Sequence, residues 1–470
     1  MSEGAESGLR RFATGIGPLD DMLGGGVPAY AVVVLAGEPG TGKTIMSQQM
    51  LFANAARGRK GLYLSTLSEP PIKAARYQSS FAFFDPDRFG ESVIYMDIGE
   101  TIRRQGLGKA TEVIATALRQ NQPDLVVIDS FKAIHDLATS LHDVRTFTYD
   151  MAIELAAIQA TSFLVGEYAP QDVPRMPEFA VADGIIWLSL EQVGSAMRRY
   201  LRILKMRGVG NPTTPFSFAI STAGISLFAL PTVVPASPPT REAIRTGVPG
   251  LDELLRGGVP AGSPFLVSGE AGTGKTTLAM QYLYNGAAEY GENGVYFSYE
   301  ESPEQIVANA RAFGWDFPAQ EERGLLTLRH TPLPQVDADA EIVRIQQTLA
   351  ATGARRAVID SLTMLVHGIE SPDTVQRHVY NLVNILKNAG CTALLTTDPP
   401  AGSGLISRFG VEESILDGVI VLRTAKEDRE RKRYLEVYKV RGVNHATGDS
   451  LMRIASEGIR VFPRVEEVVR

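Results

Sequence analysis

The sequence repeats itself once, and this repeat constrains the fold more than any other feature. Residues 14–28, TGIGPLDDMLGGGVP, match residues 246–260, TGVPGLDELLRGGVP, at an offset of 232 residues. The segment GEPGTGKT at 37–44 matches GEAGTGKT at 269–276 at the same offset, and four later blocks follow in the same order with little drift. Because solenoid repeats are only about 20–50 residues long, this period indicates duplication of a whole domain.

The repeat divides the 470 residues into two halves of similar length. Between them lies the stretch LPTVVPASPPTRE, whose prolines suit neither a central strand nor the middle of a helix. We predict an N-terminal domain at residues 1–230, a linker at 231–242 and a C-terminal domain at 243–470. Length alone, at roughly 150 residues per domain, suggests about three domains.

Each half alternates short apolar runs rich in β-branched residues with segments long enough for helices. The run AVVVLAG at 31–37 precedes a helix-like segment at 44–58, and the second copy has such a segment at 276–291. Gly58 and Gly291 suit the left-handed end of each helix. This alternation predicts an α/β fold with a mostly parallel central sheet and helices on both faces. The late blocks of each half, which include RYLRILKMRG and RYLEVYKVRG, predict antiparallel strands at one end of the sheet.

Composition excludes several functional classes. The chain is 44% hydrophobic and 21% charged, as in soluble globular proteins, and no run approaches the roughly 20 apolar residues of a membrane span. Since no apolar segment follows the first charges, we expect a cytoplasmic protein without a membrane partner. A net charge of −7 argues against nucleic acid as a partner. The single cysteine, Cys391, lies in an apolar run and is expected to be buried, and the scattered histidines predict no zinc site.

Both copies carry the Gly-x4-Gly-Lys-Thr pattern of a phosphate-binding loop (P-loop). Glycines let backbone N–H groups turn toward phosphate oxygens, the lysine reaches the β- and γ-phosphates, and the threonine hydroxyl binds Mg²⁺. Each pattern follows an apolar run and opens a helix-length segment, as the motif requires. The predicted ATP-binding residues of the first half are Gly37, Glu38, Pro39, Gly40, Thr41, Gly42, Lys43 and Thr44. Those of the second half are Gly269, Glu270, Ala271, Gly272, Thr273, Gly274, Lys275, Thr276 and Thr277.

A Mg²⁺-nucleotide site also needs a carboxylate at the end of a neighbouring buried strand. Asp129 and Asp360 each follow an apolar run and precede a serine, at matching positions of the two copies. We predict that they bind Mg²⁺ together with Thr44 and Thr276. An aspartate at a strand end can instead cap a helix N-terminus.

The copies differ where hydrolysis or phosphoryl transfer needs a group that orients or deprotonates the nucleophile. The second half reads FSYEESPEQ, in which Glu300 and Glu301 are the predicted catalytic base, whereas the aligned residues of the first half are Leu67 and Ser68. The glutamates could instead be a solvated pair ahead of a helix, since SPEQ is typical of a helix start. The candidate substitutes in the first half are Glu69, two residues off the alignment, and Glu167, on a later strand.

A Lys-x-Arg pair follows in each half, at Lys205 and Arg207 and at Lys439 and Arg441. Alternation along a strand directs both side chains of a pair to one face. Two cations that face a neighbouring subunit's γ-phosphate would stabilise the transition state as an arginine finger supplied in trans. The other interpretation is a solvated edge strand that its charges protect from pairing.

This combination of motifs resembles the KaiC family of tandem RecA-like P-loop ATPases. It comprises the P-loops, the double glutamate, the aspartate-serine strand ends and Lys-x-Arg-Gly, headed in each half by TG(V/I)xxLDxxLxGGxP, and it covers roughly residues 10–465. The resemblance implies two RecA-like P-loop NTPase domains that form two stacked rings of a homo-hexamer, with ATP at the subunit interfaces. It also implies an N-terminal ring that is chiefly an ATPase and a C-terminal ring that is an autokinase and autophosphatase acting on a Ser/Thr pair.

The resemblance assigns roles to matching residues of this sequence. It makes Lys43 with Thr44, and Lys275 with Thr276, the ligands of nucleotide and metal, and it assigns the base to the glutamate pair. The Lys-x-Arg pairs become fingers in trans. Because the first half lacks the double glutamate of the family, the resemblance implies ATP binding there and leaves hydrolysis at that site open.

The family's phosphorylated hydroxyl pair lies shortly before the aspartate of a later strand. An ungapped count back from Asp417 puts Glu413 and Ser414 at those two positions. Glu413 would resemble a permanent phosphate in charge, which leaves Ser414 as the candidate phospho-acceptor. Ser414 could equally be an unmodified serine. The chain ends at Arg470, soon after its last strand-like run, so we expect no long tail for a clock activator and no complete oscillator.

These observations favour a slow ATPase with Ser/Thr autokinase activity that acts in signalling or timing. It would use ATP and Mg²⁺, form a homo-hexamer and have other signalling proteins as partners. One alternative is a nucleotide-gated hexameric scaffold with little catalysis, which the altered first site supports. The other is a DNA-dependent RecA-type recombinase or helicase, against which the acidic charge balance argues.

Overall fold

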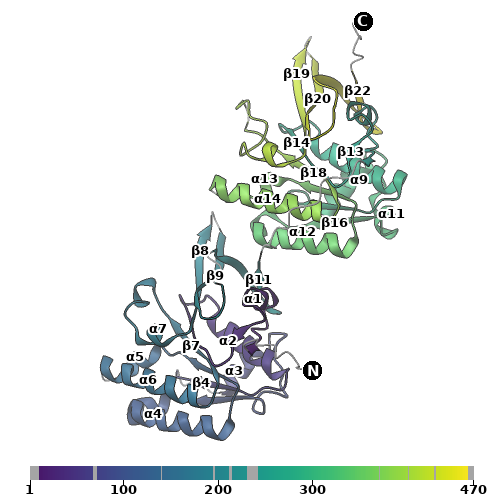
Figure 1. Ribbon diagram of the computed structural model, residues 1–470. Coiled ribbons are helices and arrows are strands. Elements are labelled where there is room, and N and C mark those ends of the chain that lie inside the picture. Colours follow the sequence, from purple (N-terminus) through teal and green to yellow (C-terminus); the bar gives the residue numbers. More distant parts are fainter. Residues whose placement is uncertain are drawn as a thin grey trace, which may run out of the picture. The chain divides into compact units, whose positions relative to one another are not determined.

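The computed structural model of the chain divides into two compact units, residues 1–229 and residues 230–470 (Figure 1). It describes residues 10–66, 71–138, 140–193, 196–210, 214–229, 242–369, 371–400, 402–427 and 430–463. The predicted linker at 231–242 lies outside these ranges except for its last residue.

The large sheet of the first unit is parallel through most of its width and antiparallel at one end. Its strand order is β11-β10-β9-β8-β3-β7-β6-β4-β5. The strands from β8 to β5 are parallel, whereas β9, β10 and β11 are added antiparallel. The strands are β3 (Val32–Gly37), β4 (Gly61–Ser65), β5 (Val93–Asp97), β6 (Leu125–Asp129), β7 (Thr161–Glu167), β8 (Gly184–Val193), β9 (Ala196–Met206), β10 (Phe216–Ser221) and β11 (Gly224–Phe228). A small second sheet pairs β1 (Arg11–Phe12) with β2 (Val27–Pro28).

Helices cover both faces of this sheet because its central strands are apolar on both sides. Val33 and Leu35 of β3 belong to one core, with side chains of α2, and the alternating Val32 and Val34 belong to another, with side chains of α4 and α6. The helices are α1 (Gly17–Met22), α2 (Lys43–Ala55), α3 (Pro71–Gln78), α4 (Gly99–Asn121), α5 (Ala133–Leu137), α6 (Leu141–Ala157), the 3₁₀ turn η1 (Pro170–Asp172) and α7 (Pro177–Val181).

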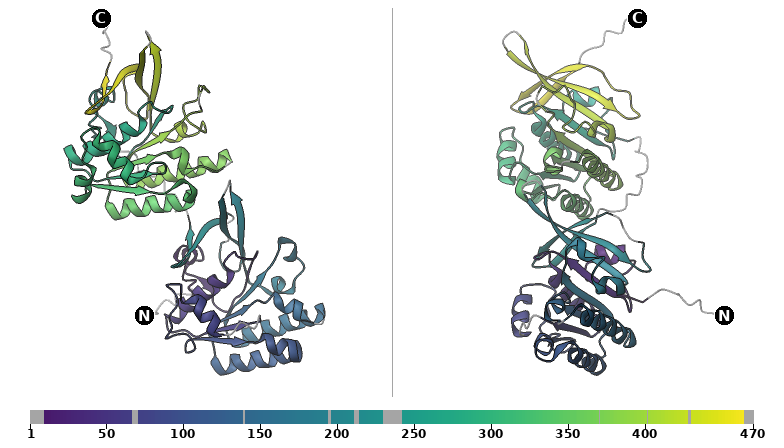
Figure 2. Two further views of the ribbon diagram at one scale, coloured as in Figure 1. Left: turned by 180° about the vertical axis from the view of Figure 1, so that it is seen from behind. Right: turned by 90° about the vertical axis from the view of Figure 1, so that its left-hand side faces the viewer.

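The second unit repeats this architecture, as the two further views in Figure 2 also show. Its strand order is β16-β15-β17-β18-β14-β19-β20-β21-β22, with β20, β21 and β22 added antiparallel. The strands are β12 (Ala243–Ile244), β13 (Val259–Pro260), β14 (Pro264–Gly269), β15 (Gly294–Ser298), β16 (Leu326–His330), β17 (Arg356–Asp360), β18 (Thr392–Thr397), β19 (Gly418–Glu427), β20 (Glu430–Val440), β21 (Asp449–Ala455) and β22 (Gly458–Phe462). The helices are α8 (Leu251–Leu254), α9 (Lys275–Tyr290), α10 (Pro303–Arg311), α11 (Phe317–Glu322), the 3₁₀ turn η2 (Leu333–Gln335), α12 (Ala338–Thr352), α13 (Leu362–Leu365), α14 (Pro372–Asn388) and α15 (Glu412–Ile415).

Several expectations from the sequence are confirmed. Both units have the predicted α/β fold, with antiparallel strands at one end of the sheet. The helices expected at 44–58 and 276–291 are α2 and α9, and Gly291 ends α9 in a left-handed conformation with φ 62°. Cys391 is buried, and burial raises the pKa of its thiol to about 12. Among the helices of the described residues, none has both the length and the apolar character needed to cross a membrane.

Candidate nucleotide sites at the two P-loops

Each P-loop joins a buried central strand to the first turn of a long helix, from β3 to α2 and from β14 to α9. Gly42 and Gly274 precede the helices with φ of 102° and 107°, a backbone conformation that strains residues with a Cβ. The hydroxyl of Thr41 donates to the Glu38 carbonyl over 2.8 Å, and Thr273 makes the same contact with the Glu270 carbonyl in the second loop. The N–H groups at a helix N-terminus favour an anion, so both loops have the geometry of a phosphate cradle.

The first P-loop opens onto a cavity of about 680 Å³. Its walls include Gly42, Lys43 and Thr44 from the loop and helix, and Asp129 and Glu167 from the ends of β6 and β7. Five residues that the sequence analysis singled out are therefore brought together, although they come from three separate segments.

The lysine of the first loop is buried and surrounded by acidic groups. Lys43 Nζ donates to the Glu38 carbonyl at 2.7 Å. Burial lowers the pKa of Lys43, and the negative charges of Glu167, Asp129 and Glu38 oppose that shift. Within the described residues that carbonyl is its one hydrogen-bond acceptor, so the ammonium keeps N–H donors that can bind phosphate oxygens.

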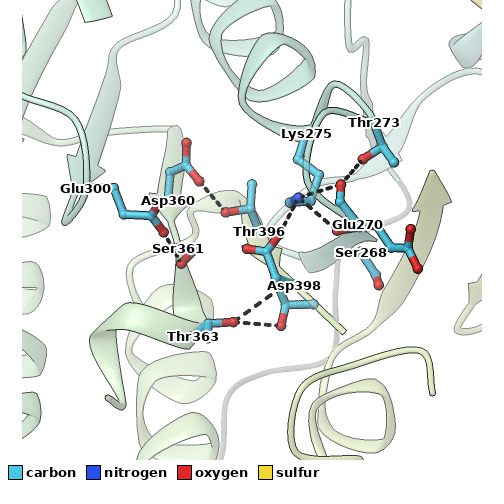
Figure 3. Close-up of polar contacts among 12 residues, drawn as sticks. Ser268, Glu270, Thr273, Lys275, Glu300, Asp360, Ser361, Thr363, Thr396 and Asp398 are labelled. Atoms are coloured by element: carbon cyan, nitrogen blue, oxygen red, sulfur yellow. Dashed lines mark hydrogen bonds and ion pairs between the residues drawn. The ribbon is translucent and has the colours of Figure 1, made fainter. Parts of the chain in front are cut away.

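The lysine of the second loop has more partners (Figure 3). Lys275 Nζ donates to the carbonyls of Gly269 and Glu270 at 2.8 and 3.2 Å, and to Asp398 Oδ1 at 2.6 Å. Asp398 directly follows β18, next to the loop strand β14. The sequence analysis did not single out Asp398, because nothing in the run TTDPP indicates that its carboxylate reaches the P-loop.

The first predicted metal-side aspartate lies beside its partner threonine. Asp129 Oδ2 accepts hydrogen bonds from Thr44 Oγ1 and from the Tyr63 hydroxyl, both at 2.7 Å. Burial raises the pKa of Asp129, and these two hydrogen bonds oppose the shift. A carboxylate and a hydroxyl this close form an oxygen ligand set that suits Mg²⁺. The residues present therefore fit the predicted metal.

In the second half, the aspartate is engaged differently. Asp360 Oδ2 accepts from the Tyr296 hydroxyl at 2.6 Å, and Oδ1 accepts from Thr396 Oγ1. Within the described residues, no hydrogen bond joins Thr276, the second residue of α9, to Asp360. The alternative role as a helix cap is not observed, because Ser361 caps α13.

The glutamate pair lies between β15 and α10, and its two side chains diverge. Glu300 Oε1 accepts from Ser361 Oγ at 3.1 Å, so this carboxylate is directed toward the end of β17 (Figure 3). Glu301 Oε2 accepts from Asn309 Nδ2 at 3.1 Å, on α10. Burial is the main cause that raises the pKa of both carboxyls. The cap of α10 is Ser302 and not a glutamate, and of the two glutamates Glu300 is the one that contacts the end of β17, next to Asp360.

The corresponding segment of the first half is only partly described. Leu67, Ser68 and the candidate substitute Glu69 lie outside the described residues. The other candidate substitute, Glu167, lines the first cavity.

The Lys-x-Arg pairs contact the turn that precedes β8 or β19. Lys205 Nζ donates to the Ala182 carbonyl at 2.6 Å, and Arg207 Nη1 contacts Asp183 Oδ1 at 2.8 Å. β9 lies between β8 and β10, and β20 between β19 and β21, but within the described residues the pairing with β10 and with β21 ends at Leu201 and at Glu436. Lys205 and Lys439 pair with β8 and β19 alone, so the interpretation of a charged strand edge stays open beside that of a finger in trans. Both cations of the pair reach one short segment, as alternation along a strand predicts.

In the second half this contact includes the candidate phospho-acceptor. Lys439 Nζ donates to the carbonyls of Glu413 and Leu416 at 2.7 and 3.0 Å, and Arg441 contacts the Ser414 carbonyl. Burial and the charge of Arg441 lower the pKa of Lys439. The Ser414 side chain is on α15 and donates to a backbone carbonyl at 2.7 Å. The acceptor candidate therefore lies beside the two cations.

Four further residues, two tyrosines and two arginines at matching positions of the copies, belong to the sites but were missed. Tyr63 and Tyr296 bind the two aspartates, and their matching positions in GLYLS and GVYFS were a usable signal. Arg433 of β20 donates to the Gly272 carbonyl of the second P-loop at 3.4 Å. Its counterpart Arg199 lines the first cavity, and the repeated RYL block that both arginines open could have indicated them.

Comparison with known proteins agrees with this geometry. The family model described as "ATPase: KaiC" matches residues 12–232 and again residues 244–466. The "Circadian clock oscillator protein KaiC" of Synechococcus elongatus is 40% identical over 228 residues, which cover 47% of this chain and 44% of that protein. The protein of the same name from Parathermosynechococcus lividus is 39% identical over 227 residues, with coverage of 47% and 42%. Each alignment thus spans about half of this chain and less than half of the relative.

Proposed function

Because this chain belongs to the KaiC family of ATPases, we propose that it binds ATP at both P-loops and hydrolyses it chiefly at the second. The observation that carries this proposal is the position of Glu300, whose carboxylate contacts Ser361 next to Asp360. A carboxylate with a raised pKa, beside the metal-side aspartate, suits a base that takes a proton from an attacking water or hydroxyl.

In this mechanism the residues of the second half share the work. The P-loop amides and Lys275 bind the phosphates, and Glu300 orients and deprotonates the nucleophile. Thr276 and Asp360 would hold Mg²⁺, which neutralises charge that develops on the phosphate oxygens when it is bound. In the first half, Lys43, Thr44 and Asp129 would bind Mg²⁺-ATP in the same way.

We further propose a homo-hexamer with ATP at the subunit interfaces. The support is that both Lys-x-Arg pairs contact the turns before β8 and β19, and no described hydrogen bond joins them to the P-loop of their own unit. Cations held together in this way could act on a nucleotide of the next subunit, as an arginine finger does.

We also propose that the protein phosphorylates its own Ser414. The support is the contact between Arg441 and the Ser414 carbonyl. If Arg441 faces the γ-phosphate of the neighbouring subunit, this contact keeps Ser414 close to that phosphate. A role in signalling or timing rests on the names of the relatives alone.

A scaffold that uses ATP mainly to assemble is the second candidate for the first half. It is favoured by Leu67 and Ser68, which stand where the second half has its glutamates. Sedimentation with and without ATP, compared with turnover at each site, distinguishes assembly from catalysis.

The decisive experiment replaces Glu300 and Glu301 together by glutamine and follows ATP turnover and ATP binding. We expect turnover to be lost and binding to be retained. Turnover equal to that of the unaltered chain contradicts the proposal. Mass spectrometry of residues 402–417 after incubation with ATP tests phosphorylation, with Ser414→Ala as the control.

A further inference from the structure

The ammonium group of Lys275 is saturated by acceptors from its own chain. An ammonium has three N–H donors. The three acceptors within hydrogen-bond distance are two P-loop carbonyls and Asp398 Oδ1, which is the closest at 2.6 Å. The Lys275 side chain is only 9% exposed, so water is a poor substitute for any of these partners. A phosphate oxygen can therefore bind Lys275 only if one of the three contacts is released.

The first half has a carboxylate at the same place but lacks this contact. Glu167 pairs with Gly37, which begins the first P-loop, and Asp398 occupies the corresponding place beside the second. Within the described residues, Lys43 donates to a single backbone carbonyl, and no hydrogen bond joins it to Glu167. The ion pair is therefore a property of the second half and not of the shared fold.

The end of β18 supplies a second contact that the first half lacks. Thr396 donates to Asp360 Oδ1, while Tyr296 occupies Oδ2. The matching residue of β7 is Val165, as the pairing of both strands with the P-loop strands shows, and valine has no hydroxyl. Thr396 near the end of β18 and Asp398 just after it thus bind the metal-side aspartate and the phosphate-side lysine at once, as Figure 3 shows.

We propose that Asp398 competes with the phosphates of ATP for Lys275, and that this competition lowers the affinity of the second site for ATP more than for ADP. A carboxylate and a phosphate bind an ammonium through the same charge-assisted hydrogen bond, so one must displace the other. Because the P-loop lysine reaches the β- and γ-phosphates, a displaced Asp398 stays close to the γ-phosphate and repels its charge. ADP lacks that group. This inference rests on the proposed ATP binding at both sites.

The test measures each site alone in the full chain. Lys43→Ala removes binding at the first site, and in this background the second site is titrated with a non-hydrolysable ATP analogue and with ADP. Asp398→Asn should raise affinity for the ATP analogue about tenfold and for ADP about threefold or less, which is the range of one charge-assisted hydrogen bond at a partly exposed pair. Asp398→Glu, which keeps the charge, should stay near the parent affinity, and Asp398→Ser should repeat the gain if the asparagine variant folds poorly.

The control experiment makes the equivalent substitution at the first site. In a Lys275→Ala background, Glu167→Gln should give a clearly smaller gain than Asp398→Asn gives at the second site, because it breaks no hydrogen bond to the lysine. Unchanged or weaker binding of the ATP analogue to the asparagine and serine variants overturns the proposal, as does an equal gain for both nucleotides. If the second site binds neither nucleotide even in the Lys43→Ala parent, the proposed function itself fails, so the two failures are distinguishable.

Discussion

The hydroxyl of Tyr296 donates a 2.6 Å hydrogen bond to Oδ2 of Asp360, from the middle of β15 to the end of β17. Tyr63 makes the same bond to Asp129 over 2.7 Å in the first unit. A hydrogen bond to a buried carboxylate fixes the direction of its oxygens, and that direction decides how the carboxylate meets a metal ion. Tyr296 is therefore a positioning residue for Asp360, and its removal can be tested directly.

Tyr296→Phe deletes one donor to Asp360 and leaves the ring. A hydrogen bond to a charged group contributes about 1.5–3 kcal/mol, so we expect ATP turnover to fall by roughly tenfold or more and the Mg²⁺ concentration for half-maximal turnover to rise. The control is Tyr282→Phe, which removes another buried hydroxyl that donates to the Thr392 carbonyl. A loss of the same size in both variants would show a general packing effect instead.

Turnover should depend on pH through the glutamate pair. Burial raises the pKa of Glu300 and Glu301 in the folded protein, so the base is protonated and inactive below that raised value and active above it. The acid limb of kcat against pH should therefore lie above the ordinary glutamate pKa of about 4.3. Glu300→Gln should abolish ATP turnover, whereas Glu301→Gln should keep both the turnover and its acid limb. An activity loss confined to Glu301→Gln would assign the base to the other residue.

Catalysis in trans predicts complementation between two inactive variants. Lys275→Ala subunits lack the phosphate lysine, and Arg441→Ala subunits lack a finger, so each alone should show little turnover at the second site. Mixed assemblies contain interfaces in which an intact P-loop meets an intact Arg441, and they should regain part of the activity. Measurement of turnover against mixing ratio checks this. Mixtures that never exceed the separate variants would show that Arg441 does not act across an interface.

Two adjacent arginines, Arg355 just before β17 and Arg356 at its first position, offer a matched stability test. Arg356 is 1% exposed, pairs with Glu292 at 2.6 Å and donates to the Tyr282 carbonyl at 3.0 Å. Arg355 is half exposed and its contact with the same glutamate is 3.7 Å long. Arg356→Met should lower the free energy of unfolding by about 3 kcal/mol, because it leaves a largely buried carboxylate with only the long contact to Arg355. Arg355→Met should change it by about 0.5 kcal/mol or less. Urea denaturation measures both, and equal effects would contradict the assignment.

The sequence predicted the fold well because its strongest signals are local. Apolar runs such as AVVVLAG and the P-loop glycines specify strands, turns and helix starts within a few residues. The duplication then doubled each signal, which is why Asp129 and Asp360 could be paired with distant loops. The strand environment of Lys205 could not be predicted in the same way, because the pairing of β9 with β10, which ends at Leu201, is set by register across the sheet and not by local charge.

Contacts between distant segments could not be predicted in the same way. Asp398 reaches Lys275 across 123 positions of the chain, and its neighbours in the sequence give no indication of that contact. The cis peptide bonds after Asp129 and Asp360 likewise have no sequence signal. The roles of Tyr63 and Tyr296 could have been predicted, since both occupy the same position of an aligned block. Aromatic residues in buried strands, however, usually belong to the hydrophobic core.

The strand order β14-β19-β20 leaves a single strand between the second P-loop and the strand that carries Lys439. Neighbouring strands are about 4.8 Å apart, so these two strands are held roughly 10 Å apart by the hydrogen-bonded ladders on either side of β19. Neither can shift along the sheet without breaking those ladders. In the proposed ring, each subunit would then fix the distance between the nucleotide that it binds and the neighbouring nucleotide that its Lys-x-Arg cations contact. Motion that follows hydrolysis would then not arise from strands that slide within one of these sheets.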